Sequence, residues 1–199
     1  MKIKIINNIN TIFFIFLLFF FLSNCDQKTE DKTKIDQEIK VKVFSSLTCP
    51  HCANFHENVI IKIKNDSDLR NIVKFQHIGF PLDLAALNAE KVLECSKNQE
   101  NRFELLTHLY NQQNNWTSGN DINDINESLI KLVKKFGLSR SSIEKCLKDE
   151  ELEEKILEKV LNAQKEFKIK STPTIYINKK KYEGKHNYKN FKKEIEKLF

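Results

Sequence analysis

Hydrophobic and polar positions change their period several times along the chain, and each period predicts an element. Residues 39–45 (IKVKVFS) alternate with period two and are rich in β-branched side chains, which predicts a β-strand. From residue 52 to residue 63 apolar side chains recur at helical spacing, so a helix should follow a tight turn at Cys49. Residues 71–80 predict a second strand, closed by Pro81. This order favours an α/β sheet with a right-handed parallel crossover.

A long helical section comes next. Its predicted helices share apolar residues at i, i+3 and i+4 spacing and cover residues 84–97, 100–113, 124–137 and 150–169. Gly137 is predicted to end the third of them as a C-cap. Ser141 and Glu144 form a capping-box pattern, which predicts that a further short helix starts there.

The C-terminal part returns to sheet-forming patterns. Residues 172–178 (TPTIYIN) have period two and predict a strand, and residues 180–184 turn the chain back. Residues 188–199 predict a closing helix. The fold class is therefore α/β, with an α-helical insertion in the sheet.

The pattern divides the folded part of the chain into two domains. We expect residues 39–81 and 169–199 to form the sheet domain, and residues 82–168 to form the inserted helical domain. No internal repeat interrupts this order.

The N-terminus predicts export and a membrane anchor. A basic start precedes an apolar run from Ile12 to Leu22, which is too short to span a bilayer but fits the core of a signal peptide. The following LSNC resembles a bacterial lipobox, so residues 1–24 are predicted to be a lipoprotein signal peptide and Cys25 to be lipidated. Asn24 stands where such boxes have Gly, Ala or Ser, which leaves an uncleaved N-terminal anchor as the alternative. Residues 25–38 are polar and predict a flexible tether.

Composition and charge exclude a nucleic-acid-binding function. The formal net charge is +6, but the lysines alternate with glutamates along helical segments such as KDEELEEKILEKV. Mixed charge of this kind is typical of a solvated helix face. Hydrophobic residues make up 40% of the chain, enough for a folded core.

The chain has five cysteines, an odd number for an exported protein. If Cys25 carries lipid, four remain, and Cys49 and Cys52 form one pair by proximity. Cys95 and Cys146 are then candidates for a second, structural disulfide in an oxidising compartment. Two buried free thiols are the alternative.

Only Pro50 and His51 separate Cys49 from Cys52, and three kinds of site use such a pair. A structural zinc site needs four ligands, and the sequence has neither a second CxxC nor an HxxxH pattern. No metal is therefore expected there. A copper-carrying module, using two thiolates and a histidine, remains an alternative. The third kind of site is a redox centre.

The redox interpretation explains more of the sequence. A free cysteine has a pKa of about 8.5, so a reactive cysteine needs its thiolate stabilised. At a helix N-terminus, Cys49 would meet unpaired backbone N–H groups and the positive end of the dipole. Pro50 suits the first turn, and His51 adds a charge-assisted interaction. Cys52 would be the resolving thiol. Stabilising the Cys49 thiolate makes the disulfide a stronger oxidant, which favours oxidation of substrates.

Three motifs in this order resemble the DsbA-type thiol:disulfide oxidoreductases. They are TCPHCANFHE at the cysteine pair, VKFQHIGFPLD after the first helix, and STPTIYIN near the C-terminus. The resemblance covers residues 40–199 and implies a thioredoxin fold with an inserted α-helical domain. It also implies that the enzyme needs no bound cofactor.

The resemblance assigns roles to individual residues. Cys49 would be the nucleophile, Cys52 its buried partner, and Pro173 a cis-proline facing the active site. Thr172 would offer its backbone to an extended substrate as an added strand. The first strand ends in VFSSLTC, without the aromatic–acidic pair often found there in relatives, which leaves open what exchanges a proton with Cys52.

The sequence thus predicts a monomeric, lipid-anchored periplasmic oxidase. It would introduce disulfides into reduced or unfolded exported proteins, and a membrane redox partner would reoxidise it. Asp26 after Cys25 resembles an inner-membrane retention signal. A disulfide isomerase or reductase is one alternative, since threonine at position 172 also occurs in isomerases. A chaperone-like or copper-carrying thioredoxin-fold module without enzymatic activity is another.

Overall fold

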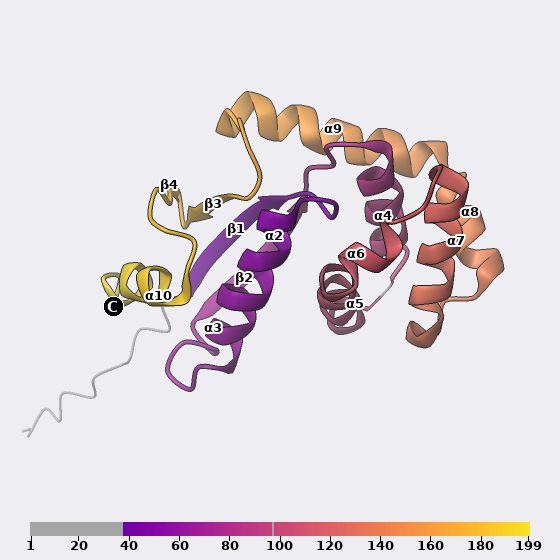
Figure 1. Ribbon diagram of the computed structural model, residues 1–199. Coiled ribbons are helices and arrows are strands. Elements are labelled where there is room, and N and C mark those ends of the chain that lie inside the picture. Colours follow the sequence, from indigo (N-terminus) through magenta and orange to yellow (C-terminus); the bar gives the residue numbers. More distant parts are fainter. Residues whose placement is uncertain (1–37, 97) are drawn as a thin grey trace, which may run out of the picture. The chain divides into compact units, whose positions relative to one another are not determined.

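The strand predicted at residues 39–45 forms as β1 and lies inside a four-stranded sheet of order β2-β1-β3-β4 (Figure 1). β1 pairs in parallel with β2, in the register Val43 to His77, and antiparallel with β3, in the register Val43 to Ile175. The strands are β1 (Ile39–Ser45), β2 (Val73–Gly79), β3 (Thr174–Ile177) and β4 (Lys180–Lys181). β3 is shorter than the strand predicted at residues 172–178, and residues 180–181, which were predicted only to turn the chain back, pair with β3 as β4.

The computed structural model describes residues 38–96 and 98–199. The predicted signal peptide, the predicted lipidation site Cys25 and the tether up to residue 37 lie outside the described residues.

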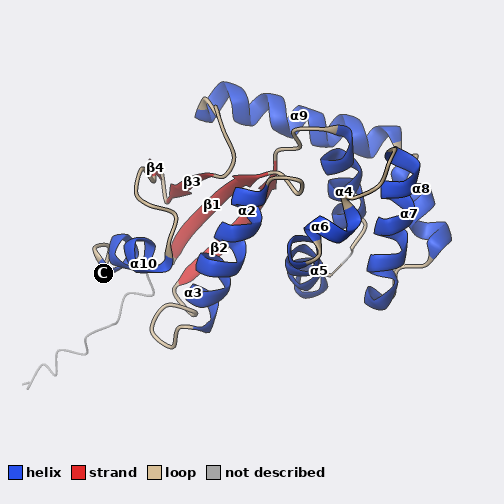
Figure 2. Cartoon of the chain, viewed as in Figure 1, coloured by secondary structure: helices blue, strands red, loops and turns tan. Residues whose placement is uncertain are grey.

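One face of the sheet is covered by two helical segments, the crossover between β1 and β2 and the C-terminal helix (Figure 2). The crossover is continuous: α2 (Pro50–Phe55), the π-helical η1 (His56–Ile60) and α3 (Ile61–Asn65). α10 (Tyr188–Glu196) packs beside it. The alternation of β1 directs Ile39, Val41 and Val43 into this core, as the period-two pattern predicted.

The opposite face of the sheet carries α9 (Glu150–Phe167). Phe44, which alternates to this side of β1, packs against Phe167 with ring centroids 4.8 Å apart. α9 belongs to the helical insertion by sequence, and it therefore links the insertion directly to the sheet.

The rest of the insertion is a block of short helices with its own core, which includes Leu93, Leu105, Leu109 and Trp116 (Figure 1). Its helices are α4 (Leu84–Glu94), α5 (Gln99–Asn111), α6 (Gln113–Trp116), α7 (Ile122–Val133), the 3₁₀ turn η2 (Lys134–Phe136) and α8 (Arg140–Leu147). Cys49 and Cys52 pack into this same core. The insertion is thus part of the environment of the site.

Cys95 and Cys146 form a disulfide inside this block, with their Cα atoms 6.5 Å apart. Cys95 caps the C-terminus of α4 and Cys146 lies in α8. The bridge therefore encloses α5, α6 and α7 in one covalent loop.

Helix ends agree with the sequence in part. Gly137 ends its helix in the left-handed conformation (φ 76°), as predicted. The predicted capping box is wrong: Ser139, not Ser141, caps α8, and its hydroxyl accepts a hydrogen bond from the backbone N–H of Ser142. The serines at 139, 141 and 142 all suit a cap by type, and the sequence pattern selected the wrong one.

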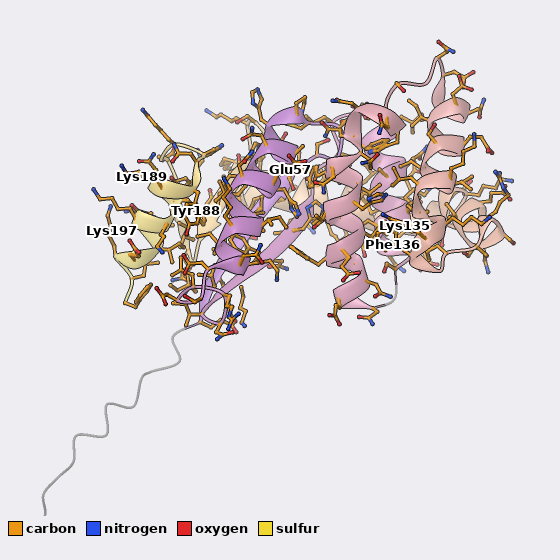
Figure 3. All side chains as sticks on the ribbon, turned by 60° about the horizontal axis from the view of Figure 1, so that its bottom comes forward. Glu57, Lys135, Phe136, Tyr188, Lys189 and Lys197 are labelled. Atoms are coloured by element: carbon orange, nitrogen blue, oxygen red, sulfur yellow. A yellow bond between two sulfur atoms is a disulfide. The ribbon has the colours of Figure 1, made fainter. Side chains whose placement is uncertain are left out.

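Charged side chains spread over the outer faces of the helices (Figure 3). Glu57 projects from the active-site helix, and Lys189 and Lys197 project from the C-terminal segment. Within residues 38–96 and 98–199, no helix is both long enough and apolar enough to span a bilayer.

Candidate active site

Cys49 lies where β1 ends and the active-site helix begins. It adopts an extended backbone (φ −83°, ψ 118°) as the N-cap of α2, and Pro50 takes the first helical position. The Cys49 backbone N–H donates to the Ser46 carbonyl at 3.2 Å, while the Cys49 carbonyl accepts from the backbone N–H of Cys52 at 3.0 Å. The Leu47 side chain is buried in the helical core. Burial of Leu47 on one side of Cys49 and the hydrogen bond to Cys52 on the other hold the loop that carries Cys49 in place.

A buried amide from the insertion holds this loop from the other side. Gln113 Nε2 donates to the Leu47 carbonyl at 2.7 Å and to the Cys49 carbonyl at 3.2 Å. Sequence reasoning missed Gln113, because it stands in the polar run NQQNN with nothing to separate it from its neighbours.

The segment predicted to face the cysteines does so. The Thr172–Pro173 peptide bond is cis, and Pro173 is buried. The Cys49 thiol donates to the Thr172 carbonyl at 3.5 Å, across 123 residues of sequence. Thus Cys49, Cys52, Thr172 and Pro173 come together as the sequence predicted.

The environment stabilises Cys49 as a thiolate. Burial by itself raises the pKa of Cys49, but hydrogen bonds from the Thr172 side chain, from Cys52 and from the His51 backbone outweigh burial, and the pKa is lowered overall. The contribution of His51 in the structure comes from its main chain and was not predicted. Its imidazole is exposed, and an effect of that ring on Cys49 stays a prediction.

Cys52 has the opposite character. Its side chain is 2% exposed, and burial, followed by the charge of Cys49, raises its pKa far above that of a free thiol. In the reduced protein Cys49 therefore loses its proton more readily than a free thiol, and Cys52 keeps its proton. This asymmetry is what a nucleophile and a buried resolving thiol need.

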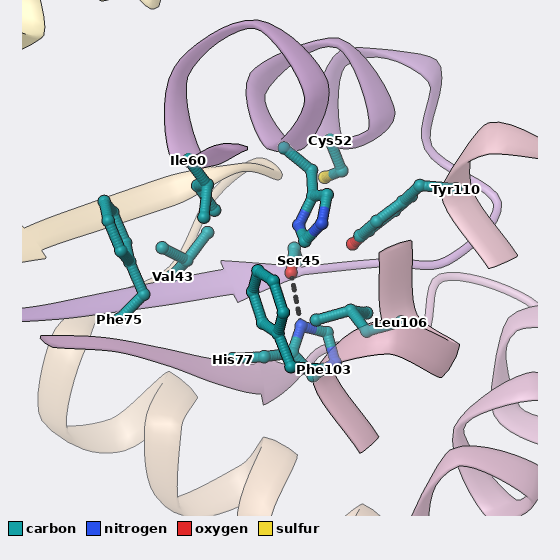
Figure 4. Close-up of a pocket in the computed structure, with 10 residues that line it drawn as sticks. Val43, Ser45, Cys52, Ile60, Phe75, His77, Phe103, Leu106 and Tyr110 are labelled. Atoms are coloured by element: carbon teal, nitrogen blue, oxygen red, sulfur yellow. Dashed lines mark hydrogen bonds between the residues drawn. The ribbon is translucent and has the colours of Figure 1, made fainter. Parts of the chain in front are cut away.

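Behind Cys52 lies a small cavity lined mostly by aliphatic and aromatic side chains, with a few polar groups among them (Figure 4). His56 and His77 both reach it, although they are 21 positions apart in the sequence. Thr107 donates to the Phe103 carbonyl, so its oxygen accepts from His56 Nε2 at 2.8 Å. Burial lowers the pKa of His56 to about 3, with smaller contributions from His77 and Lys64, and His56 therefore stays neutral.

Sequence reasoning did not single out these two histidines. The sequence could have indicated His77. This residue lies on the same face of the strand as Val73 and Phe75, where the period-two pattern predicts an apolar side chain. A polar residue at such a position is informative when it lies beside a candidate catalytic group.

Within the described ranges, no group of three or more His, Cys, Asp or Glu side chains could hold a metal ion. The copper-carrying alternative therefore lacks a third protein ligand beside Cys49 and Cys52 in this part of the chain.

Comparison with known proteins agrees with this site. A family model described as Thioredoxin matches residues 36–197. The crystal structure of Wolbachia pipientis alpha-DsbA1 superposes with a TM-score of 0.72 at 28% identity, covering 81% of this chain and 85% of that one. Oxidised BdbD from Bacillus subtilis gives a TM-score of 0.66 at 25% identity, covering 82% and 88%.

Sequence relatives have matching names. A Rickettsia bellii protein named as a protein-disulfide oxidoreductase is 26% identical over 144 residues, which are 72% of this chain and 54% of that protein. A Bacillus anthracis protein named for disulfide bond formation (protein D) is 26% identical over 153 residues, 73% of this chain and 67% of that protein. The chain thus spans about half the length of its Rickettsia relative. It belongs to the thioredoxin family, as a DsbA-like member with a helical insertion in the fold.

Proposed function

We propose that this protein is a thiol:disulfide oxidoreductase that introduces disulfide bonds into exported proteins through Cys49 and Cys52. The observation that carries the proposal is the geometry of the pair: Cys49 caps the N-terminus of α2 against the Thr172 carbonyl, and Cys52 is buried behind it. The pKa is accordingly lowered for Cys49 and raised for Cys52. A sulfur that is stable as a thiolate is a good leaving group, so the disulfide form is reactive toward substrate thiols. The names of the relatives support the same activity.

The reaction starts from the oxidised pair. A substrate thiolate attacks the Cys49 sulfur, and the Cys49–Cys52 bond breaks with its electron pair on Cys52, which takes up a proton. A second substrate thiolate then attacks the substrate sulfur of the mixed disulfide, and Cys49 leaves as a thiolate. The substrate loses two electrons and the protein gains them.

Thr172 and Pro173 would hold the substrate. An extended peptide beside Thr172 can exchange main-chain hydrogen bonds with it as an added strand, which recognises backbone more than side chains. Such recognition suits an enzyme that acts on many reduced or unfolded chains.

The remaining proposals concern the setting of the enzyme. The export signal and lipidation at Cys25 would tether a monomer to the membrane on the periplasmic side, with the inner membrane favoured. A membrane redox partner would accept the two electrons and restore the Cys49–Cys52 disulfide. The Cys95–Cys146 bridge would be structural, because it lies in the helical block and closes a loop of that block.

The test is the reduction potential of the Cys49–Cys52 pair, measured against glutathione on the chain without residues 1–25. Disulfide-donating and reducing members of the fold differ widely, from about −120 mV to about −270 mV. We expect a value toward the first. A value toward the second would replace the oxidase with a reductase or isomerase. A Cys49→Ala variant separates either enzyme from a chaperone-like module, since a chaperone keeps its activity without Cys49.

A further inference from the structure

Cys52 must exchange a proton in every catalytic cycle of the proposed oxidoreductase, on which this inference rests. It leaves as a thiolate when a substrate opens the disulfide, and it must lose its proton again before it can displace a redox partner from Cys49. Yet the Cys52 side chain is 2% exposed, and its high pKa keeps it protonated. Bulk water does not reach a thiol that is buried to this extent. Proton exchange between Cys52 and solvent therefore has to pass through groups of the protein.

The cavity behind Cys52 leads to such a path. It has a volume of about 30 Å³, room for a water molecule, and Cys52, Ser45, Tyr110 and His77 line it. The Cys52 sulfur and the Tyr110 hydroxyl both point into it, toward Ser45 (Figure 4). Among the described residues the Tyr110 hydroxyl finds no hydrogen-bond partner, so it is free to bond to whatever occupies the cavity.

A chain of two hydrogen bonds leaves the cavity on its far side. Ser45 Oγ lies 2.9 Å from His77 Nδ1, and His77 Nε2 lies 2.9 Å from Glu90 Oε2. An ionised carboxylate only accepts hydrogen bonds, so Nε2 carries the proton of the neutral ring and Nδ1 accepts from the Ser45 hydroxyl. The ring can therefore take a proton on the side that faces Cys52.

This series of hydrogen bonds ends at a larger groove on the surface of the protein. Glu90 and His77 both line a groove of about 660 Å³ beside β2. Arg102 lies 3.8 Å from the other oxygen of Glu90 and also pairs with Glu94. Gly79 makes room for the carboxylate, since a Cβ at that position would lie 2.6 Å from Glu90 Oε1. The carboxylate thus stands between the buried ring and the groove.

We infer that Ser45, His77 and Glu90 form a proton relay that connects Cys52 to this groove. When Cys52 must become a nucleophile, its proton passes through a water or the Tyr110 hydroxyl to Ser45 Oγ, and the Ser45 proton moves to His77 Nδ1. The imidazolium is held by Glu90 and releases its Nε2 proton there. The Cys52 thiolate then attacks Cys49 and expels the partner as a thiolate. Reversed, the same steps protonate Cys52 during substrate oxidation.

Other groups around His77 cannot replace it. His56 faces it from η1, but its pKa of about 3 keeps it neutral and its Nε2–H is committed to Thr107. Burial raises the pKa of Tyr110 well above that of a free tyrosine, so Tyr110 can pass a proton but not hold a charge. Ser45 is 3% exposed, which excludes a direct attack on a substrate.

The test separates the step that uses Cys52 from the step that uses Cys49. The reduced chain without residues 1–25 reacts with oxidised glutathione, and samples are quenched in acid and weighed by mass spectrometry from pH 5 to pH 9. The appearance of the glutathione adduct reports attack by Cys49, and its disappearance reports attack by Cys52. The variants are Glu90→Gln and Ser45→Ala, since the second removes only a hydroxyl and no charge.

The matched control is Glu94→Gln. Glu94 lies one turn from Glu90 on α4 and also pairs with Arg102, but it makes no contact with His77 among the described hydrogen bonds. Circular dichroism confirms the fold of each variant before the kinetics.

The relay predicts that Glu90→Gln and Ser45→Ala slow the disappearance of the adduct at least about tenfold and change its pH profile, with its appearance unchanged. Glu94→Gln should behave as wild type. Disappearance at the wild-type rate in both variants would overturn the relay, and so would an equal slowing of both steps or the same effect in Glu94→Gln. If oxidised glutathione converts the wild-type chain neither to the adduct nor to the Cys49–Cys52 disulfide, the proposed function itself fails.

Discussion

Removal of the Cys95–Cys146 disulfide should destabilise the protein by about 4 kcal/mol. The two residues are separated by 51 positions. In the chain-entropy model a closed loop of this length lowers the entropy of the unfolded chain by about 14 cal/mol/K, or about 4 kcal/mol at 25 °C. Since single domains are stable by roughly 5 to 15 kcal/mol, this bridge would supply a large share of the total.

The measurement needs a background without the second redox pair. We would compare Cys95→Ala/Cys146→Ala with its parent, both carrying Cys49→Ser/Cys52→Ser and lacking residues 1–25, by urea unfolding. The fluorescence of Trp116, which is 1% exposed, reports the helical core. The slope of free energy against urea should rise as well, because the unfolded chain becomes more expanded.

Reduction of the parent by dithiothreitol is the matched control and should reproduce the loss without any substitution. A loss below about 1 kcal/mol by both routes would refute the entropic reasoning. It would mean that the loop keeps its ends together in the unfolded state, or that the bridge is not formed.

Four further outcomes are expected. Iodoacetamide should modify Cys49 but not Cys52 in the reduced protein at pH 7, since the pKa of Cys49 is lowered and that of Cys52 raised; mass spectrometry of the peptides checks this, and equal labelling would contradict it. The pKa of Cys49 is lower in the folded protein than its unfolded value of about 8.5. The free energy of unfolding of a Cys52→Ser variant should therefore rise with pH between the folded and the unfolded pKa of Cys49, and this gain should be lost as pH falls through the folded pKa. Urea midpoints measured across this pH range check it. Gln113→Met should slow alkylation of Cys49 several-fold by freeing its loop, whereas a rate equal to wild type would show that the amide does not position it. Lys168→Gly should raise stability by about 0.5 to 1 kcal/mol, because Lys168 ends α9 with φ at 50°, and an unchanged thermal midpoint would argue against strain there.

The sequence was sufficient for features that depend on neighbouring residues. The period-two pattern predicted β1 with its observed bounds, and the cysteine spacing predicted which thiol begins the helix. The role of Gly137 was predictable because a helix end of this kind needs a residue with positive φ, and glycine adopts positive φ most easily.

Features that depend on distant packing could not be predicted in the same way. Gln113 contacts the Cys49 loop across 64 residues, and Glu90 reaches His77 only after α4 packs beside β2. The π-helical turn at His56–Ile60 is likewise invisible in the sequence, because its apolar residues fit an ordinary helix as well.

Thr172, which contacts Cys49, lies 123 residues further along the sequence. The site is therefore complete only when the C-terminal part of the chain has folded. Synthesis delivers the chain from its N-terminus, so Cys49, Cys52, Cys95 and Cys146 all emerge before the segment whose carbonyl contacts the Cys49 thiol. Until that segment arrives, Cys49 lacks the partner that helps to lower its pKa. An incompletely folded chain therefore holds a less reactive Cys49, and full reactivity depends on the last part of the sheet to be added.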